Sequence, residues 1–346
     1  MREIIRARAP LRLGLAGGGS DVSPFSNKFG GHVLNATIDL YAQVVLEPTT
    51  NGKIVFKSAD KDESVVFDSL ARLPDSKTLK LHCGIYNRMV TDFTGGNPLS
   101  FKMTTYADAP PGSGLGTSST MVVCIIKAFN EWLRLGLCEY KIANLAYQIE
   151  RIDLGFAGGK QDQYAAAFGG FNFMDFGPGD LVLVNPLRLS PWITNELEAS
   201  TVLFYTGHSR ESARIIENQI LNVDDTSSDS HAALLSLKKD AVSMKSAILR
   251  GNLKEYADVL GKSWESKKRL SNMVSNSYLD SIYTAAIAAG ATAGKLSGAG
   301  GGGFFMFYTP PEFRMDVIRG LNHFTGQVIN FNYEMSGAES WRLFGS

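Results

Sequence analysis

The stretch PPGSGLGTSST at residues 110–120 contains the residue types that could bind a phosphate group. Gly112, Gly114 and Gly116 alternate with small residues, and a glycine lets the backbone come close to a ligand because it has no Cβ. The apolar residues that follow predict a helix beginning near Thr117, whose free N–H groups and positive dipole end would favour an anion. A glycine-rich turn from strand to helix with a Ser/Thr cap would have the same composition, so other segments must decide.

This loop is not a Walker A loop. The pattern GxxxxGK[ST] requires a lysine, and none occurs between Lys102 and Lys127, so positive charge must come from another part of the chain. A hydroxyl side chain at the start of the helix, such as Ser118, could bind Mg²⁺, as the hydroxyl of a P-loop does.

A second glycine segment lies near the N-terminus. We expect a strand that ends at Pro10 and then a close-approach loop with three successive glycines at 17–19. Asp21 could accept hydrogen bonds from sugar hydroxyls, or it could cap a helix over 22–29. Arg12, close to this loop, could bind a phosphate or could be an ordinary surface cation.

Two carboxylates frame a third segment, ERIDLGFAGGKQDQ. Glu150 falls at the edge of the apolar stripe of a helix predicted over 139–153, where a carboxylate needs a partner such as a metal ion. Asp162 lies in the first turn of a short helix predicted over 161–168; this position keeps the carboxylate ionised and suits a group that orients or deprotonates a hydroxyl. A solvated glutamate at a helix end and a simple N-terminal cap are the alternatives.

The fourth segment, KLSGAGGGG at residues 295–303, contains the spacing GxGxxG. The following FFMFY predicts a strand, whereas a dinucleotide site needs a helix at that point, so a nicotinamide-dependent dehydrogenase is rejected. The glycines instead suit a wall of backbone beside a ligand.

Composition excludes several classes of protein. The 346 residues contain 34 basic and 34 acidic side chains, which argues against a nucleic-acid partner. The N-terminus has no apolar core typical of a secretory signal, and the longest apolar runs are too short to span a membrane. Three cysteines and five histidines show no metal-ligand spacing. We expect a cytoplasmic protein with reduced thiols and no membrane partner.

The length favours two domains, and prolines and polar residues over 186–196 indicate the boundary between residues 1–190 and 191–346. Both halves are predicted to be α+β, the second with its helices segregated from an antiparallel sheet. The first half has predicted strands at 3–8, 41–47, 53–57, 63–67 and 99–106, helices at 78–94, 118–135, 139–153 and 161–168, and a hairpin at 170–184. The second half has predicted strands at 200–205 and within 292–308, and helices at 210–221, over three segments to about 289, and at 311–323.

In this order, the four segments resemble the GHMP small-molecule kinases. The resemblance extends from Ala9 to Phe307, and PPGSGLGTSS and KLSGAGGGGFF are its most specific motifs. It implies a two-domain GHMP kinase fold, with an N-terminal domain like ribosomal protein S5 domain 2 and a ferredoxin-like C-terminal domain. It also implies ATP and Mg²⁺ as cofactors.

The resemblance implies a role for each segment. Ser118 and Glu150 would hold Mg²⁺, Asp162 would be the catalytic aspartate, and Arg12 would lie near the reacting centre. The ATP phosphates would contact Pro111, Gly112, Ser113, Gly114, Leu115, Gly116, Thr117, Ser118 and Ser119. The acceptor sugar would contact Gly17, Gly18, Gly19, Ser20, Asp21, Gly298, Gly300 and Gly301.

The motif APLRLGLAGGGSD is similar to the branch that contains heptose 7-phosphate kinases and fucokinase-like enzymes, and the compact length fits the former. Galactokinases have Glu-His where this chain has Gly18 and Gly19. The implied reaction phosphorylates the anomeric hydroxyl of D-glycero-D-manno-heptose 7-phosphate, for bacterial heptose nucleotide and polysaccharide biosynthesis. A phosphorylated acceptor requires a basic clamp, for which Lys160, His208 and Arg210 are candidates, although ordinary surface charge explains each equally well.

Two other functions stay open from the sequence. One is another sugar 1-kinase, acting on fucose, galactose or a related hexose. The other is a non-catalytic homologue that binds nucleotide or sugar; such a protein should lack the metal ligand or the base, whereas Ser118, Glu150 and Asp162 are all present. A homodimer is possible.

Overall fold

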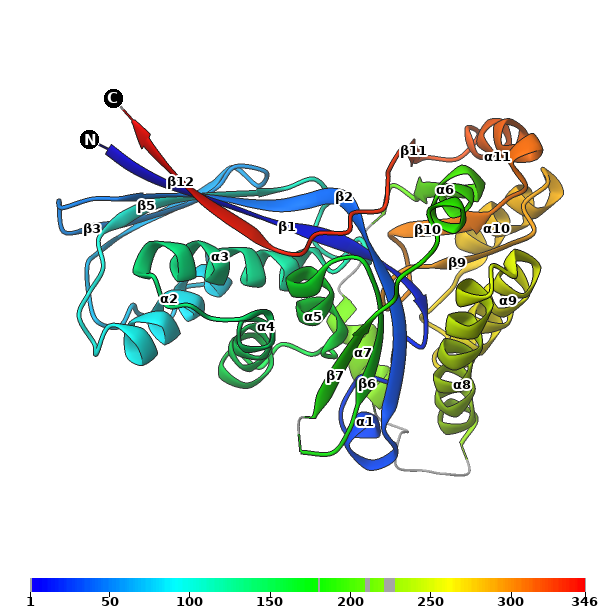
Figure 1. Cartoon of the computed structure of the whole chain (residues 1–346), viewed down its shortest axis with the longest axis horizontal. Helices are drawn as coiled ribbons and strands as arrows, with labels where there is room; N and C mark the ends of the chain where they lie inside the picture. Colours follow the sequence, from blue (N-terminus) through cyan, green and yellow to red (C-terminus); the bar gives the residue numbers. More distant parts are fainter. Residues whose placement is uncertain (1, 180, 209–211, 221–227, 346) are drawn as a thin grey trace.

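The computed structural model describes residues 2–179, 181–208, 212–220 and 228–345. Within these residues the strands form two sheets, one of eight strands and one of four. Figure 1 shows the larger sheet with helices on one of its faces, and the smaller sheet with its own helices at the other end of the molecule. This is the predicted α+β class.

The larger sheet has the order β12-β1-β2-β5-β3-β4, and β6 and β7 extend it alongside β2. Its strands are β1 (Arg2–Ala16), β2 (Gly31–Pro48), β3 (Lys53–Ser58), β4 (Glu63–Asp68), β5 (Phe101–Ala107), β6 (Phe171–Phe176), β7 (Val182–Pro186) and β12 (Glu339–Gly345). Its helices are α2 (Lys80–Phe93), α3 (Thr117–Leu133), α4 (Glu139–Tyr147) and α5 (Gln161–Phe168). The apolar residues of α3 are buried almost all round, as predicted for a helix inside a domain.

The expectation that the first strand ends at Pro10 is wrong. β1 continues to Ala16, and the pairing with β2 shifts register between Pro10 and Leu11. Proline has no N–H for the ladder, and a bulge accommodates it without ending the strand. Arg12 and Gly14 therefore lie within a strand, opposite residues of β2.

The helix predicted over 139–153 is divided. Glu139–Tyr147 forms α4, and Gln148–Asp153 continues it as a π-helical segment. Such widened turns are rare and are found mostly at functional sites. Glu150 lies in this segment, so its side chain has a direction that a regular α-helix would not give.

The smaller sheet has the order β11-β8-β10-β9, with antiparallel neighbours throughout. Its strands are β8 (Thr201–Tyr205), β9 (Ala293–Leu296), β10 (Phe304–Tyr308) and β11 (Gln327–Ile329). Along the chain, β8 is followed by helices, then β9, β10, α11 (Arg314–Leu321) and β11, which is the ferredoxin-like order. The helices before β9 are α7 (Ser212–Ile220), α8 (Asp229–Leu249), α9 (Leu253–Lys268) and α10 (Ser277–Ala288).

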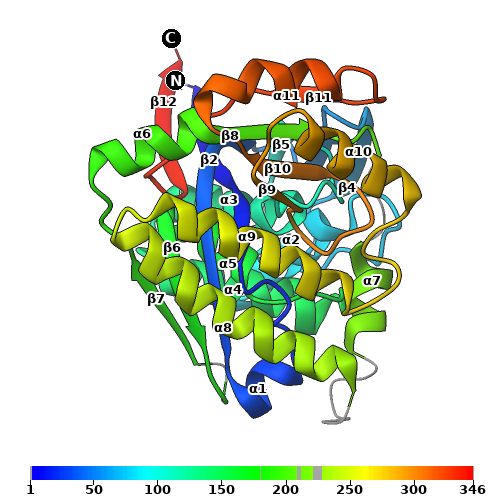
Figure 2. The ribbon, with the colours of Figure 1, turned by 90° about the vertical axis from the view of Figure 1, so that its right-hand side faces the viewer.

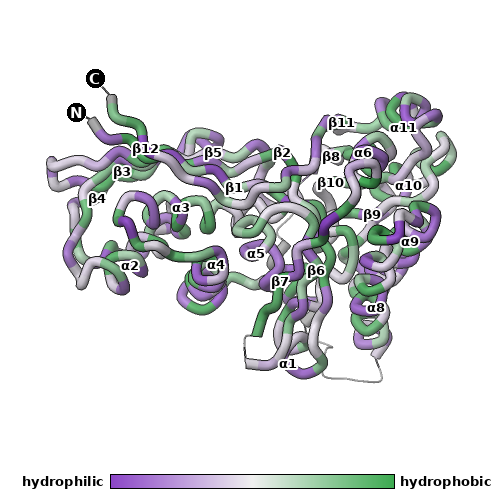
Figure 3. Tube along the Cα trace, in the orientation of Figure 1, coloured by the Kyte–Doolittle hydropathy of each residue, from purple (hydrophilic) through white to green (hydrophobic). Residues whose placement is uncertain are grey.

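Figure 2 shows α8 and α9 side by side, and both pack against strands of the sheets, α8 on β1 and β2, α9 on β9 and β1. Hydrophilic and hydrophobic stretches alternate along both helices in Figure 3, as expected for helices with one buried face. One apolar core contains Leu11 and Leu13 of β1, Met244 of α8, Leu260 of α9 and Met306 of β10. The two halves of the chain are therefore packed together around β1.

The boundary near residue 190 stays a prediction. The helix α6 (Pro191–Ser200) begins there and leads into the smaller sheet. The chain later returns, because β12 pairs with β1 along seven residues of the larger sheet. In the described part of the chain, no helix is both long and apolar enough to cross a membrane.

Candidate active site

Two glycine loops cross and touch each other in the structure. One is residues 110–116, the phosphate-loop candidate, and the other is residues 297–303, called here the second glycine loop. In the loop before α3, Gly112, Gly114 and Gly116 have positive φ values of 77°, 86° and 78°. A Cβ at Gly114 would collide with the backbone of Ser297, and a Cβ at Gly298 would collide with the backbone of Gly114. The glycines are therefore required partly for the contact between the two loops, in addition to any contact with a ligand.

The hydroxyl of Ser297 joins three segments at this crossing. It donates to the carbonyl of Gly114 at 2.8 Å and accepts from the backbone N–H of Gly14 and from Arg12 Nη1, each at 3.2 Å. Ser297 is fully buried. The phosphate-loop candidate, the end of β1 and the second glycine loop are thus held by one side chain.

The N-terminal end of α3 has no side-chain cap. Its capping residue is Gly116, with a left-handed backbone, and no side chain accepts a hydrogen bond there. The alternative of a Ser/Thr-capped turn is therefore wrong, and Ser118 points away from the cap toward Glu150.

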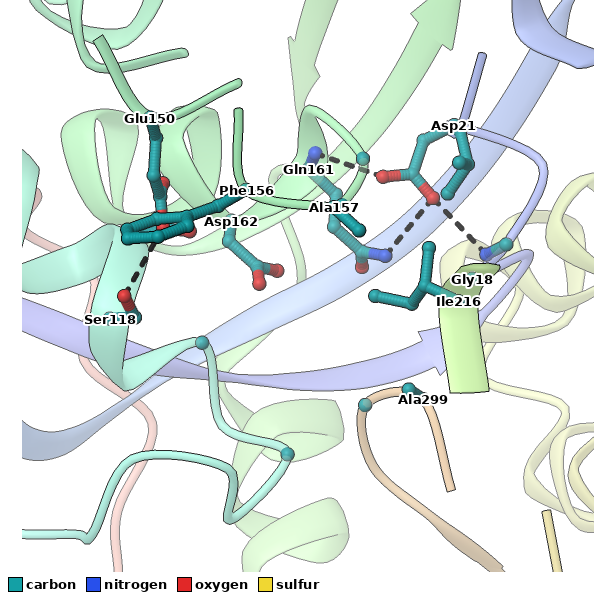
Figure 4. A pocket seen from close by; sticks show the side chains of 18 of the residues that line it. Gly18, Asp21, Ser118, Glu150, Phe156, Ala157, Gln161, Asp162, Ile216 and Ala299 are labelled. Carbon is teal, nitrogen blue, oxygen red and sulfur yellow. Dashed lines mark hydrogen bonds between the residues drawn. The ribbon is translucent and has the colours of Figure 1, made fainter. Parts of the chain in front are cut away.

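A pocket of about 640 Å³ opens beside this crossing. The predicted residues that line it are Arg12, Gly18, Gly19, Asp21, Pro111, Gly112, Gly114, Gly116, Thr117, Ser118, Ser119, Glu150, Asp162 and Gly298. Figure 4 shows Asp162 between two pairs of side chains, Ser118 with Glu150 on one side and Gln161 with Asp21 on the other. Ile216 of α7 and Ala299 lie across from them.

Asp162 and Arg12 form an ion pair at the middle of the pocket. Arg12 Nη2 and Nε lie 2.6 Å and 2.8 Å from Asp162 Oδ1, and Arg12 Nη1 also donates to the carbonyl of Gly114. Only 3% of Arg12 is exposed, so it is not a surface cation. Asp162 lies in the first turn of α5, as predicted, but the N-cap position is Lys160, so Asp162 is not a simple cap.

Ser118 and Glu150 meet at the end of the pocket nearest α3. Ser118 Oγ donates to Glu150 Oε1 at 3.2 Å, and Gln163 Nε2 donates to Glu150 Oε2 at 2.7 Å. Arg151 Nη1 lies 3.4 Å from Glu150 Oε1. Because only 1% of Glu150 is exposed, the alternative of a solvated glutamate at a helix end is wrong.

Asp21 lies at the opposite end of the pocket and does not cap the helix predicted over 22–29. The short helix α1 (Phe25–Phe29) follows Pro24, without a side-chain cap. Asp21 instead accepts hydrogen bonds from the backbone N–H groups of Gly19 and Gln161 and from Gln161 Nε2, at 3.1, 3.1 and 3.2 Å. Burial raises the pKa of the Asp21 carboxyl, an effect that the bond from the Gln161 backbone opposes.

The remaining predicted residues fall outside the lining. Ser113 and Leu115 are buried behind the phosphate-loop candidate, and Ser20 bonds to the backbone at Gly17 and His32. Outside the lining as well are Gly17, Gly300, Gly301, Lys160 and His208. Arg210 lies outside the described residues.

Two of the three candidates for a basic clamp, Lys160 and His208, have other contacts and are not part of the pocket lining. Lys160 is buried with its ammonium over the ring of Tyr147, 5.1 Å from the centroid. The ring of His208 packs edge-on against Tyr278, with 5.6 Å between centroids. Their binding of a substrate phosphate stays a prediction, and no contact in the structure supports it.

Four polar residues near the pocket were not predicted from the sequence: Arg151, Gln161, Lys267 and Lys295. Lys267 is the one with a recognisable signal, because it continues the buried stripe of Tyr256, Leu260 and Trp264 along α9, where a lysine is unusual. Lys295 is buried beneath the site and donates to the carbonyls of Gly14 and Leu15.

Both halves of the chain are similar to known kinases. Residues 81–170 match the model of the GHMP kinases N-terminal domain, and residues 244–319 match that of the GHMP kinases C-terminal domain. The chain is 49% identical, over 98% of its length and 99% of the other protein, to a D-glycero-alpha-D-manno-heptose 7-phosphate kinase of Campylobacter jejuni. This chain belongs to the GHMP kinases.

Two other relatives extend the comparison. A crystal structure of a D-glycero-D-manno-heptose 1-phosphate kinase from Bacteroides thetaiotaomicron is 46% identical, with a TM-score of 0.85, and the match covers 99% of this GHMP kinase and 100% of that chain. An L-fucokinase/L-fucose-1-P guanylyltransferase of Bacteroides fragilis is 29% identical over 90% of this kinase but only 35% of that longer protein. The predicted family, fold and kinase activity are thereby confirmed.

Gly298→Ala should disrupt the loop crossing. The new Cβ would also lie 2.9 Å from the carbonyl oxygen of Gly114, so the phosphate-loop candidate has to move. We therefore expect the affinity for ATP to fall at least about tenfold, which equals about 1.4 kcal/mol of binding free energy. Gly52→Ala is the matched control, because Gly52 has a similar φ of 67° but nothing within 4 Å of its Cβ position. Equal ATP dissociation constants for the two variants in calorimetry would contradict this prediction.

Proposed function

We propose that this GHMP kinase transfers the γ-phosphoryl group of ATP to the anomeric hydroxyl of D-glycero-D-manno-heptose 7-phosphate, giving the 1,7-bisphosphate. The proposal rests on the order of side chains in one pocket. The hydroxyl of Ser118 and the carboxylate of Glu150 come first, then the ion-paired carboxylate of Asp162, then the hydrogen-bonded pair Asp21 and Gln161. Full-length similarity to the Campylobacter heptose 7-phosphate kinase supports the choice of acceptor. The reaction would serve bacterial heptose nucleotide and polysaccharide biosynthesis in the cytoplasm.

The loop before α3 would bind the phosphates of ATP. Its glycines have the left-handed backbone that turns successive N–H groups toward one side, and α3 adds the positive end of a 17-residue helix. No lysine of a Walker type is needed, because Arg12 reaches this loop at the carbonyl of Gly114. Positioning and charge neutralisation are the main requirements of phosphoryl transfer.

Ser118 and Glu150 fit a Mg²⁺ ion. Their oxygens lie 3.2 Å apart at the pocket wall, and hydroxyl and carboxylate oxygens are the ligands that Mg²⁺ prefers when phosphates complete its shell. The ion would supply positive charge to the β- and γ-phosphate oxygens. Gln163 donates to the other oxygen of Glu150, Oε2, and Arg151 lies 3.4 Å from Oε1, so both hold the carboxylate in place.

Asp162 would accept or orient the proton of the acceptor hydroxyl. Arg12 holds one of its oxygens, Oδ1, which leaves Oδ2 for the substrate. The same guanidinium would steady the charge on the phosphoryl group during transfer. The sugar would extend from Asp162 toward Asp21 and Gln161, which line the far end of the pocket.

A substrate screen tests the reaction. In an assay coupled to ADP release, we expect the highest kcat/KM with heptose 7-phosphate, against heptose 1-phosphate, unphosphorylated heptose, fucose, galactose and mannose. Phosphorus NMR of the product should show a new phosphate on the anomeric carbon. A higher kcat/KM for fucose or galactose would overturn the proposed acceptor and favour another sugar 1-kinase.

Asp162→Asn should lower kcat by about 10²–10⁴-fold, because the amide cannot accept the proton. Binding of ATP with Mg²⁺ should be retained, which calorimetry can measure. Asp316→Asn is the control, since Asp316 is exposed and ion-paired with Arg319 far from the pocket. Near-normal turnover of Asp162→Asn would rule out the proposed role.

Glu150→Gln should raise the Mg²⁺ concentration for half-maximal rate about tenfold, equal to about 1.4 kcal/mol of affinity. The amide keeps the shape of the side chain but loses the charge that would bind the ion. Glu255→Gln, in an exposed ion pair with Arg250, is the control. An unchanged Mg²⁺ titration of the rate would exclude Glu150 as a ligand.

A further inference from the structure

We propose that the ammonium group of Lys267 binds the phosphate that the acceptor sugar already carries. This inference rests on the proposed function, since it requires a phosphorylated acceptor. It assigns the basic clamp to α9, a helix of the C-terminal half, and to a residue outside the sequence motifs of the family.

The position of Lys267 places it at the acceptor end of the pocket. Lys267 lines the pocket, near the C-terminal end of α9, and its Nζ donates to the carbonyl of Gly298 in the second glycine loop. Less than one turn further on, Leu270 lies beside Gly19: a Cβ at Gly19 would meet Leu234 of α8 at 3.5 Å and Leu270 at 3.6 Å. Lys267 therefore lies between the two glycine segments predicted to contact the sugar.

The other cations of the lining already have carboxylate partners. In the described part of the lining the cations are Arg12, Arg151 and Lys267. Arg12 is ion-paired with Asp162, and Arg151 lies 3.4 Å from Glu150 and donates to the hydroxyl of Ser119. Lys267 has a carbonyl as its hydrogen-bond acceptor and no ion pair with a described residue, so its positive charge is available to an anion.

Burial makes this charge costly in the absence of a ligand. Only 4% of Lys267 is exposed. Burial, with the neighbouring charge of Arg12, lowers the pKa of the ammonium to about 8, while Asp21 and Asp162 oppose the shift. A phosphate dianion within hydrogen-bond distance of Nζ would compensate the ammonium group for its lost hydration, whereas a neutral hydroxyl, which has no charge, would not.

The other lysines near the site do not reach the pocket. Lys295 is buried against the carbonyls at the end of β1, and Lys160 lies over the ring of Tyr147. Neither is part of the lining. Lys268 is next to Lys267 in sequence but points away, because it is ion-paired with Glu265 at 2.8 Å and lies over the ring of Trp264.

The test compares Lys267→Met with Lys268→Met, using heptose 7-phosphate and unphosphorylated heptose as acceptors. Methionine keeps much of the lysine stem and removes the charge. For Lys267→Met we expect KM for heptose 7-phosphate to rise about 100-fold. KM for ATP, and kcat/KM with unphosphorylated heptose, should stay within about threefold of wild type, and Lys268→Met should match wild type with both acceptors. Thermal melting and ATP binding verify that Lys267→Met is folded; if it is not, the proposal is tested by the pH profile of Lys267→Arg, which keeps the charge.

Each outcome has a defined meaning. An unchanged ratio of the two acceptors in Lys267→Met overturns this inference and leaves the proposed function standing. An equal loss of kcat with both acceptors also overturns it, because Lys267 would then act on the transferred group. Inactivity of the wild-type enzyme on heptose 7-phosphate overturns both proposals.

The pH dependence provides a second readout. The charged groups that face Lys267 are Arg12, Asp21, Asp162 and Lys295. As the pH rises through about 8, Lys267 loses its proton, so KM for heptose 7-phosphate should rise about tenfold between pH 7 and 9 in the wild type. In Lys267→Arg the guanidinium stays charged, and KM should be flat over this range. The same rise in both proteins would contradict the assignment.

Discussion

The site depends on the close contact between two glycine loops that are almost two hundred residues apart in the chain. At this contact Gly114 and Gly298 touch through their backbones, and Ser297 binds both loops and β1. No side chain other than hydrogen fits at either glycine, so the positions of the phosphate-loop candidate and of the C-terminal half are fixed together. Arg12 can reach Gly114 and Asp162 at once only because this contact brings β1 beneath the loop.

Because the two loops are held together, the charged side chains of the pocket lie in a definite order. Ser118 and Glu150 lie at the end next to α3, Asp162 and Arg12 in the middle, and Asp21 at the far end. Each carboxylate has a different set of partners. Glu150 has the Gln163 amide, the Ser118 hydroxyl and the Arg151 guanidinium, Asp162 has the Arg12 guanidinium, and Asp21 has two backbone N–H groups and the Gln161 amide. The three carboxylates of the described lining therefore lie in three different environments, as the proposed combination of a cation, a proton acceptor and a sugar in one pocket requires.

Much of the fold could be predicted from the sequence, because hydrophobic period and glycine position are local signals. The helix over 161–168 and the hairpin after it were predicted closely, and so was the order of the smaller sheet's elements. The strand through Pro10 was not, because only pairing with β2 shows that a bulge absorbs the proline. Nor was the π-helical segment at Glu150, which no local pattern encodes. Lys267 was missed because its relation to the pocket depends on how α9 packs on β9 and β1.

The return of β12 to the larger sheet has a consequence for how the enzyme is made. β1, which carries Arg12 and leads into the glycine segment at residues 17–19, has β2 on one side and β12 on the other. During synthesis β1 and β2 are made long before β12, so one edge of β1 stays unpaired until residues 339–345 have been made. Assembly of the larger sheet therefore waits for β12, and a chain stopped just short of Glu339 would leave unpaired one edge of the strand that carries Arg12.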